Sequence, residues 1–330
     1  MRHPSFKILA VVFTLTLAIP ALAQQRAPDG AAAPDANAVK EQQLLQQESR
    51  IEGRIDIPDT RARVLIQPAG RRWDYFHEIT LHRVGAIVIL GMLALLGLAY
   101  LILGRQRISS GRSGKKITRF SAFERFSHWL TAVSFVLLGL TGLNITFGKI
   151  VLLPLMGESA FSDLAQLAKY VHNFVSFAFI LGLILIVALW IKDNIPRQVD
   201  IDWLKQGGGF VKGKHAPAGR FNAGEKAVFW CALAAGAAVS VSGLLLLFPF
   251  FGTNIATMQV AQVVHALIAV LFVALILAHI YIGTLGMEGA FEAMGTGEVD
   301  VNWAKEHHDL WFVEKQAQQG LGPSSATSIK

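Results

Sequence analysis

Five long uncharged apolar runs dominate the pattern of hydrophobic and polar positions along the chain. Each is close to the roughly 20 residues that a helix needs to cross the hydrocarbon core of a bilayer. Unpaired backbone groups cannot lie in lipid, so we expect helices rather than open strands. The runs lie at about 84–103, 127–147, 171–191, 226–248 and 260–284. They predict an all-α membrane protein that folds as a transmembrane helix bundle.

A shorter apolar run at the N-terminus has the features of a secretory signal peptide. Arg2 and Lys7 make its start positive, and an apolar stretch leads to an A-x-A pattern at 21–23. This pattern is typical of a cleaved signal. It predicts that residues 1–23 are removed and that the mature chain begins outside the cytoplasm at Gln24. The alternative is an uncleaved membrane anchor.

The charged residues lie mainly in the loops between the apolar runs. The chain has a net charge of +7 and only 16% charged residues. The loops 105–126 and 192–225 are rich in Lys and Arg, whereas 148–170 and 249–259 are poor in them. The positive-inside rule then places the basic loops and the C-terminal tail in the cytoplasm of a multi-pass protein of the bacterial inner membrane. Five spans from a periplasmic N-terminus also lead to a cytoplasmic C-terminus. This topology explains the basic charge without nucleic acid.

Four of the ten histidines lie inside the apolar runs, where ionisable side chains are costly and therefore indicate function. His128 begins the second run on the cytoplasmic side, and His172 begins the third run on the outer side. His265 lies near the outer start of the fifth run, and His279 lies near its inner end. For any one of them the alternative is a hydrogen-bonded packing histidine. Together they form two predicted pairs at two membrane depths.

The spacing in the fifth run supports this pairing. His265 and His279 are 14 residues apart, close to four helical turns, so they point from nearly one face about 21 Å apart. His172 then faces His265 near the outside, and His128 faces His279 near the inside. A haem held by two histidines has both axial positions filled and suits electron transfer, so we expect two b haems, one in each leaflet. Small residues that let helices or a porphyrin approach closely include Gly139, Gly142 and Gly182.

Other metal sites and other classes of function fit the sequence less well. Zinc or copper needs ligands that converge within a few ångströms, whereas the two histidine pairs are predicted in opposite leaflets. Cys231 is the only cysteine, which excludes an intrachain disulfide, a Cys-ligated iron–sulfur cluster and a CxxCH haem attachment site. A haem-free membrane scaffold stays open as another class. A transporter is disfavoured, because no acidic residue lies in the middle of a run.

Several short motifs accompany the four histidines. They are Glu124-Arg125-Phe126-Ser127-His128-Trp129, Asn194-Ile195-Pro196 with Asp202-Trp203-Leu204, Phe221-Asn222-Ala223-Gly224-Glu225-Lys226, His279-Ile280-Tyr281 and Trp303-Ala304-Lys305-Glu306-His307-His308. With them, residues 118–315 resemble the gamma subunit, the cytochrome b subunit, of membrane-bound formate dehydrogenase. The alternative is the cytochrome b subunit of a membrane-bound nickel–iron hydrogenase. The third of these motifs and the tail motif favour formate dehydrogenase.

The resemblance implies which groups the histidines hold and which partners the chain has. His172 and His265 look like the ligands of an outer haem, and His128 and His279 look like those of an inner haem. The implied partners are an iron–sulfur (beta) subunit and a molybdenum or tungsten catalytic (alpha) subunit that oxidises formate. Electrons then run from the periplasmic side to a quinone near the cytoplasm, with no formate chemistry on this chain.

The resemblance also implies a quinone site beside the inner haem. Its positions are Asn222, Gly224 and His279, and its occupant is menaquinone or ubiquinone. An asparagine amide can hydrogen-bond a quinone carbonyl, and glycine lets the ring approach the backbone. The alternative for Asn222 is the N-cap of the fourth predicted run, with Glu225 in the first turn of that helix.

These inferences divide the chain into six parts. The short type of the family begins near His128, so resemblance to it says nothing of residues 24–104. We expect these residues either to dock partner subunits or to anchor the chain. The parts are a signal peptide (1–23), a periplasmic N-terminal segment (24–82), an extra transmembrane helix (83–104), a basic cytoplasmic loop (105–126), a four-helix dihaem cytochrome b domain (127–284) and a cytoplasmic C-terminal tail (285–330).

Overall fold

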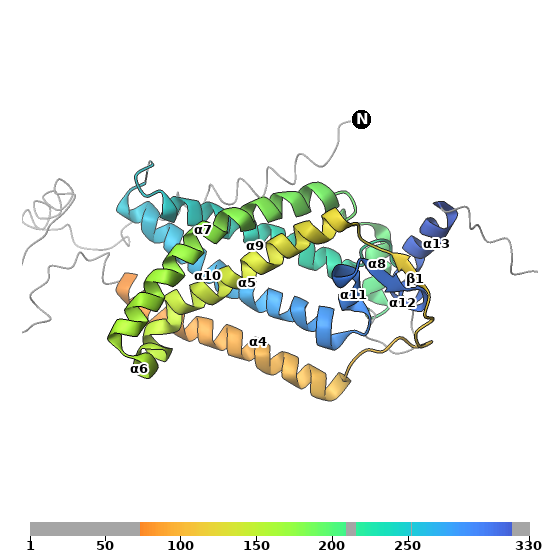
Figure 1. The fold of residues 1–330 in the computed structure, drawn as a ribbon, viewed down its shortest axis with the longest axis horizontal. Coiled ribbons are helices and arrows are strands. Elements are labelled where there is room, and N and C mark those ends of the chain that lie inside the picture. The colour runs from red at the N-terminus through yellow and green to blue at the C-terminus, as the bar shows by residue number, and fades with distance from the viewer. Residues whose placement is uncertain (1–72, 209–215, 252, 319–330) are drawn as a thin grey trace, which may run out of the picture.

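The computed structural model describes residues 73–208, 216–251 and 253–318. Within these ranges, five helices are long and apolar enough to cross a membrane. They are α4 (His82–Leu103) preceded by the π-helix η1 (Phe76–Leu81), α5 (Ala122–Val151), α7 (Glu158–Trp190), α9 (Ala223–Leu247), and α10 (Ile255–Tyr281) followed by the π-helix η2 (Ile282–Gly286). Figure 1 shows them as one elongated bundle. The predicted fold class, an all-α membrane bundle with one extra N-terminal helix, is confirmed. The predicted signal peptide (1–23) and residues 24–72 of the predicted periplasmic segment lie outside the described residues.

The helices extend beyond the predicted apolar runs. The predicted outer loop 148–170 contains the short helix α6 (Leu153–Met156) and the first part of α7. His172 therefore lies 14 residues after the start of α7 and not at its beginning. Hydropathy marks only the apolar part of a helix, whereas the hydrogen-bonded helix continues through polar residues such as Glu158 and Asp163.

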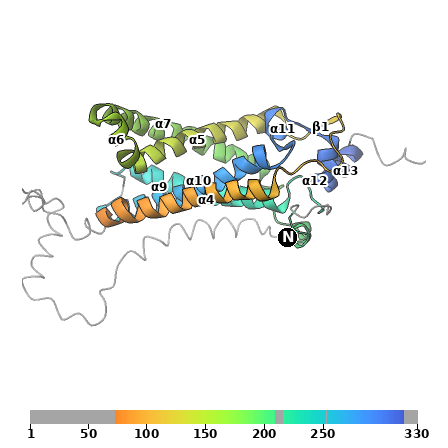
Figure 2. The ribbon, with the colours of Figure 1, turned by 90° about the horizontal axis from the view of Figure 1, so that it is seen from below.

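Two helix hairpins build the bundle. α5 packs along α7 and α9 packs along α10, while α4 lies against α10 (Figures 1 and 2). Glycines set two of the close approaches. A Cβ at Gly182 of α7 would lie 3.0 Å from the backbone nitrogen of Thr131 in α5, and a Cβ at Gly236 of α9 would lie 2.9 Å from Leu183. A side chain at Gly182 would press on the backbone of α5, and one at Gly236 would displace the end of Leu183, so both glycines favour packing at this separation.

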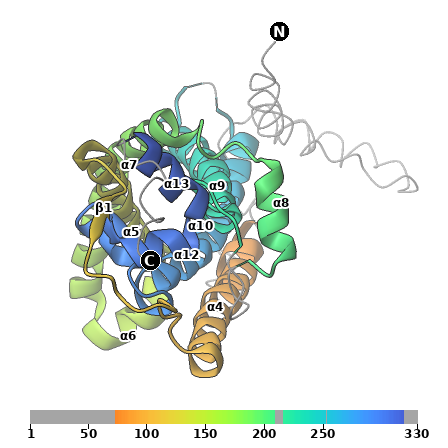
Figure 3. The same ribbon diagram turned by 90° about the vertical axis from the view of Figure 1, so that its right-hand side faces the viewer.

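The loops and the C-terminal tail form a folded cap over one end of the bundle (Figure 3). Its elements are α8 (Gln198–Lys205), β1 (Lys116–Thr118), α11 (Ala290–Gly295), β2 (Glu298–Asp300), α12 (Val301–His307) and α13 (Asp309–Gln318). β1 and β2 pair antiparallel, with Ile117 opposite Val299, and both of these side chains are buried. We call this end of the bundle the capped end.

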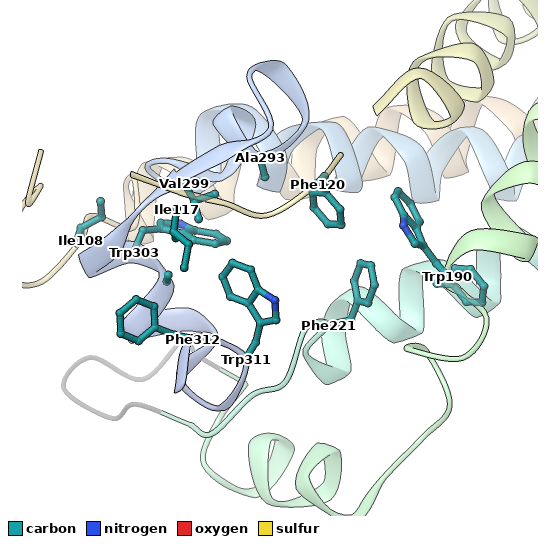
Figure 4. Packing of buried hydrophobic residues seen from close by; sticks show 12 residues of the cluster. Ile108, Ile117, Phe120, Trp190, Phe221, Ala293, Val299, Trp303, Trp311 and Phe312 are labelled. Carbon is teal, nitrogen blue, oxygen red and sulfur yellow. The ribbon is translucent and has the colours of Figure 1, made fainter. Parts of the chain in front are cut away.

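Aromatic side chains fill the core of this cap. Val299 and Ala304 are 0% exposed at its centre. The aromatic residues packed around them come from the segment before α5, from the end of α7, from the region where α9 begins and from the tail (Figure 4). They are Phe120, Trp190, Phe221, Phe229, Trp303, Trp311 and Phe312. The segment predicted only as a cytoplasmic tail is therefore folded back onto the bundle, as far as residue 318 of its described part.

Candidate functional site

The four intramembrane histidines form two close pairs. The ring centroids of His128 in α5 and His279 in α10 are 6.2 Å apart, with the ring planes inclined by 54°. The ring centroids of His172 in α7 and His265 in α10 are 6.1 Å apart, with the planes inclined by 69°. Each pair joins helices of different hairpins, so the two pairs exist only once the hairpins have packed.

The two pairs lie at different heights along the bundle. His279 is two residues before the end of α10 and His128 is six residues after the start of α5, which places both near the capped end. His265 precedes His279 by 14 residues, which is about 21 Å along a helix axis. We call His128 and His279 the capped-end pair, and His172 and His265 the distal pair.

The spacing within each pair fits one metal atom between two imidazoles. A metal–imidazole bond is about 2.0 Å, and a ring nitrogen is about 1 Å from the centre of its ring, so a shared metal holds the two centroids about 6 Å apart. The described residues contain no group of three or more His, Cys, Asp or Glu side chains that could hold a metal ion. Zinc and copper sites built from protein ligands alone need such a group. A haem takes two axial ligands, and each pair has two imidazoles.

Hydroxyl groups and glycines of the neighbouring helix support the distal pair. The Oγ1 of Thr141 is 2.9 Å from Nδ1 of His172, and the Oγ of Ser242 is 3.1 Å from Nδ1 of His265. A Cβ on the glycine that follows each hydroxyl residue would touch the same ring: one on Gly142 would lie 3.4 Å from His172, and one on Gly243 would lie 3.1 Å from His265. These contacts occupy Nδ1 and leave Nε2 of each ring as the nitrogen for a metal.

Of these supporting residues, the sequence pattern indicates only Gly142, as a site of close approach. Thr141, Ser242 and Gly243 are not predicted from the sequence. The available signal is a hydroxyl residue followed by glycine, which occurs in each hairpin on the helix before the distal-pair histidine. Such dipeptides are common in membrane helices, where small residues serve packing, so the signal has meaning only beside the histidine that it contacts.

The capped-end pair has different surroundings. The Nδ1 of His128 is buried and has no hydrogen-bond partner among the described residues. Its ring lies edge-on to Trp129, with 5.4 Å between centroids. The indole of Trp129 donates a 2.9 Å hydrogen bond to the carbonyl of Met294 in α11, which ties this part of α5 to the cap. A buried, unpartnered polar atom is uncommon in a finished core and fits a position that receives a further group.

Asn222 is the N-cap of α9, as the structural alternative in the sequence analysis predicts. Its Oδ1 accepts a 2.9 Å hydrogen bond from the backbone N–H of Glu225, and the Glu225 carboxylate accepts one from the backbone N–H of Asn222. This reciprocal pair is a capping box. A Cβ at Gly224 would lie 3.2 Å from Asn222 and 3.2 Å from Trp203 of α8. No hydrogen bond or ring contact of the described residues joins Asn222 or Gly224 to His279, although α9 begins at the capped end.

A charge cluster with a buried arginine and a buried histidine lies beside this capping box. Arg119 donates a 3.0 Å hydrogen bond to Glu225, and the Nε2 of His308 is 3.7 Å from the same carboxylate oxygen. Nδ1 of His308 donates to the carbonyl of Gly219 at 2.8 Å, because a carbonyl can only accept. Burial and the nearby Arg119 charge lower the pKa of His308 well below its ordinary value, so this ring is neutral in the fold.

The part of the bundle from α5 to α10 is similar to known proteins. Residues 119–297 match the family described as prokaryotic cytochrome b561. The chain is 33% identical over 202 residues to the cytochrome b556(fdo) subunit of formate dehydrogenase from Escherichia coli strain K12, which covers 60% of this chain and 92% of that relative. It is 28% identical over 220 residues to the nitrate-inducible cytochrome b556(Fdn) subunit of the same strain, covering 63% and 98%. The cytochrome b556 subunit of formate dehydrogenase from Haemophilus influenzae is 29% identical over 206 residues, covering 61% and 84%.

Proposed function

The chain belongs to the prokaryotic cytochrome b561 family, among the cytochrome b subunits of formate dehydrogenases, and from this premise we propose that it is the quinone-reducing electron-transfer subunit of a formate dehydrogenase complex. Its relatives are named as subunits of formate dehydrogenases. The observation that carries the proposal is that two pairs of histidines lie at two heights of one bundle. The ring centroids are 6.1 Å apart in one pair and 6.2 Å apart in the other.

The proposal assigns one b haem to each pair. His172 and His265 hold the group of the distal pair, and His128 and His279 hold that of the capped-end pair. Such a group, when bound, supplies one-electron transfer with no open coordination position. The protein's own part is to hold each pair of rings at the right separation, to exclude water with apolar helices, and to keep the two sites on one shared helix, α10.

The capped end faces the cytoplasm in this proposal, and the opposite end faces the periplasm. The connections from α4 to α5 and from α7 to α9 both lie at the capped end, together with the tail (Figure 1). These are the two loops rich in Lys and Arg. The positive-inside rule therefore supports this orientation in the bacterial inner membrane. The distal pair is then on the side of the periplasmic partners.

The quinone is proposed to bind at the capped end, near Asn222, Gly224 and His279. Asn222 uses its side-chain oxygen in the capping box, so only its amide nitrogen remains as a donor to a quinone carbonyl. The hydrogen bonds that Asn222 makes with other described residues use its N–H, its Oδ1 and its backbone carbonyl, and none uses this nitrogen. Menaquinone or ubiquinone would take two electrons from the chain and two protons from the cytoplasmic side to become the quinol.

Two partner subunits complete the proposed function. An iron–sulfur subunit delivers electrons at the periplasmic end, and a molybdenum or tungsten subunit oxidises formate. This chain has one cysteine, so it cannot provide the Cys ligands of an iron–sulfur cluster itself. Formate oxidation therefore belongs to the partners, and this chain contributes the route through the membrane.

The test uses bacterial membranes that hold the intact complex. Formate is added first and hydrogen is added to a second sample, while the absorbance of reduced b haem is recorded. We expect reduction by formate. Reduction by hydrogen but not by formate would replace the proposal with the hydrogenase cytochrome b alternative. A purified complex without any haem absorbance would leave a haem-free scaffold as the function.

A further inference from the structure

The two hairpins repeat one arrangement around the distal pair. In the first hairpin, Thr141 and Gly142 of α5 face His172 of α7. In the second, Ser242 and Gly243 of α9 face His265 of α10 in the same way. In each case the glycine lies beside the ring, more tightly at Gly243 than at Gly142, and the hydroxyl contacts Nδ1. Each hairpin therefore has a histidine that is hydrogen-bonded by the other helix of the same hairpin.

The direction of these hydrogen bonds follows from the acceptors. The hydroxyl of Thr141 donates to the carbonyl of Leu137 at 2.7 Å, so its oxygen accepts from Nδ1–H of His172. The hydroxyl of Ser242 donates to the carbonyl of Ala238 at 2.7 Å and is likewise an acceptor for His265.

His265 has a second acceptor. Its Nδ1 lies 3.0 Å from the carbonyl of Val239, which can only accept. The hydrogen of His265 therefore lies on Nδ1 and is shared between Val239 and Ser242. His172 carries its hydrogen on Nδ1 as well, and both rings of the distal pair present an unprotonated Nε2.

The capped-end pair lacks this support. The Nδ1 of His128 has no hydrogen-bond partner in the described part of the chain, and no side-chain hydroxyl of that part hydrogen-bonds the ring of His279. The two pairs thus differ in one property that matters to a bound metal. The distal rings have acceptors on their second nitrogen, whereas the capped-end rings have none from the described residues.

An acceptor on Nδ1–H makes an imidazole a stronger electron donor to the metal on its other nitrogen. A stronger donor favours the oxidised, more positive metal and lowers its reduction potential. We propose that Thr141 and Ser242 are positioning residues that make the distal haem centre the lower-potential one of the two. This inference rests on the proposed function. A lower potential at the distal haem makes electron transfer to the capped-end haem energetically downhill. Electrons would arrive one at a time at the distal pair, and the quinone would accept them at the capped end.

The test is a redox titration of the purified full complex that carries Thr141→Val. Valine keeps the shape of threonine and removes the acceptor. We expect the lower-potential b-haem component to rise in midpoint potential, with its reduction equilibrium shifted about tenfold, or ~59 mV for a one-electron couple. Thr141→Ser should restore the wild-type value. Ser242→Ala should shift the same component in the same direction, because the hydroxyl of Ser242 accepts from His265 as that of Thr141 accepts from His172.

Thr131→Val is the matched control. Its hydroxyl also donates to the carbonyl four residues earlier on α5, but it makes no hydrogen bond to a histidine. We expect both components to keep their potentials in this variant. An unshifted titration of Thr141→Val, equal shifts of both components, or the same shift in Thr141→Ser would overturn the inference. A complex that binds no haem in the wild type would instead contradict the proposed function.

Discussion

The guanidinium of Arg119 donates a 3.0 Å hydrogen bond to the carboxylate of Glu225, which ties the segment before α5 to the first turn of α9. Arg119 also lies 5.1 Å from the ring centre of Trp303 and 5.5 Å from that of Trp311. Its Nε and Nη1 have no hydrogen-bond partner among the described residues and depend on these ring faces. Arg119 thus contacts both the C-terminal tail and the helix end at which the quinone is proposed to bind.

Replacing Arg119 with alanine should destabilise the cap. The Arg119 side chain is 1% exposed and that of Glu225 is 37% exposed, so solvent screens the carboxylate that would be left alone. We expect a loss of about 2 kcal/mol, which is typical of a hydrogen bond to a charged group. The measurement is thermal unfolding of the detergent-solubilised complex, followed by tryptophan fluorescence. Arg112→Ala is the control, because its ion pairs with Glu288 and Glu292 are exposed and worth about 0–1 kcal/mol each. Equal losses in the two variants would contradict the role of Arg119.

Removing a histidine of one pair should remove one haem and leave the other. In His172→Ala or His265→Ala, the distal centre loses an axial ligand, whereas the capped-end pair keeps both of its rings. We therefore expect the haem content per complex to fall from two to one, measured as the pyridine haemochrome. His128→Ala and His279→Ala should remove the other spectral component. Retention of both haems in any of these variants would refute the assigned pairing.

Asn222→Asp separates the two roles of Asn222. Aspartate keeps an oxygen for the N–H of Glu225 and is a good N-cap, but it has no amide hydrogens to donate to a quinone. We expect unchanged haem content and thermal stability, with a KM for a soluble quinone analogue raised up to about tenfold, the upper range for one neutral hydrogen bond. Asn222→Ala should additionally lose about 1 kcal/mol from the missing cap. An unchanged KM in Asn222→Asp would limit the residue to capping.

Gly243→Ala should disturb the distal pair, whereas Gly139→Ala should not. A Cβ at Gly243 would lie 3.1 Å from the His265 ring, so the ring or α9 has to move. A Cβ at Gly139 would lie 3.9 Å from Val273, which is an ordinary contact. We expect a shifted spectrum or lower occupancy of the distal haem only in Gly243→Ala, recorded by absorbance of the purified complex. Matching spectra in the two variants would show that the ring does not depend on this glycine.

The cap should lose stability in mild acid through His308. Burial lowers the pKa of the His308 ring in the folded protein, so the unfolded chain binds a proton more readily. The stability that comes from the neutral ring is therefore fully present above the unfolded pKa of about 6.5. This stability is lost as the pH falls below that value toward the folded pKa. His308→Asn keeps an N–H for the carbonyl of Gly219 and cannot titrate. Thermal unfolding between pH 5 and pH 7 should therefore depend less steeply on pH in the variant than in the wild type. Identical slopes would assign the acid sensitivity to other groups.

The sequence by itself determined the fold class and the positions of the chemistry. A bilayer demands apolar helices of roughly 20 residues, so five such runs predict five spans. The helical period then sets the heights of His265 and His279 on α10 without any tertiary information. The cost of an ionisable group in lipid singled out the four histidines from the other six.

The tertiary structure decided features that neither the helical period nor the hydropathy of the sequence encodes. The helices run past their apolar parts, which moved His172 into the interior of α7. The cap formed because Val299 and the tail tryptophans meet α7 and α9, and such contacts between distant segments have no local signal. The contacts of Thr141 and Ser242 with the distal rings depend on how each helix is rotated against its neighbour. That rotation results from side-chain packing along the whole interface, so only the assembled bundle shows which hydroxyls reach a histidine.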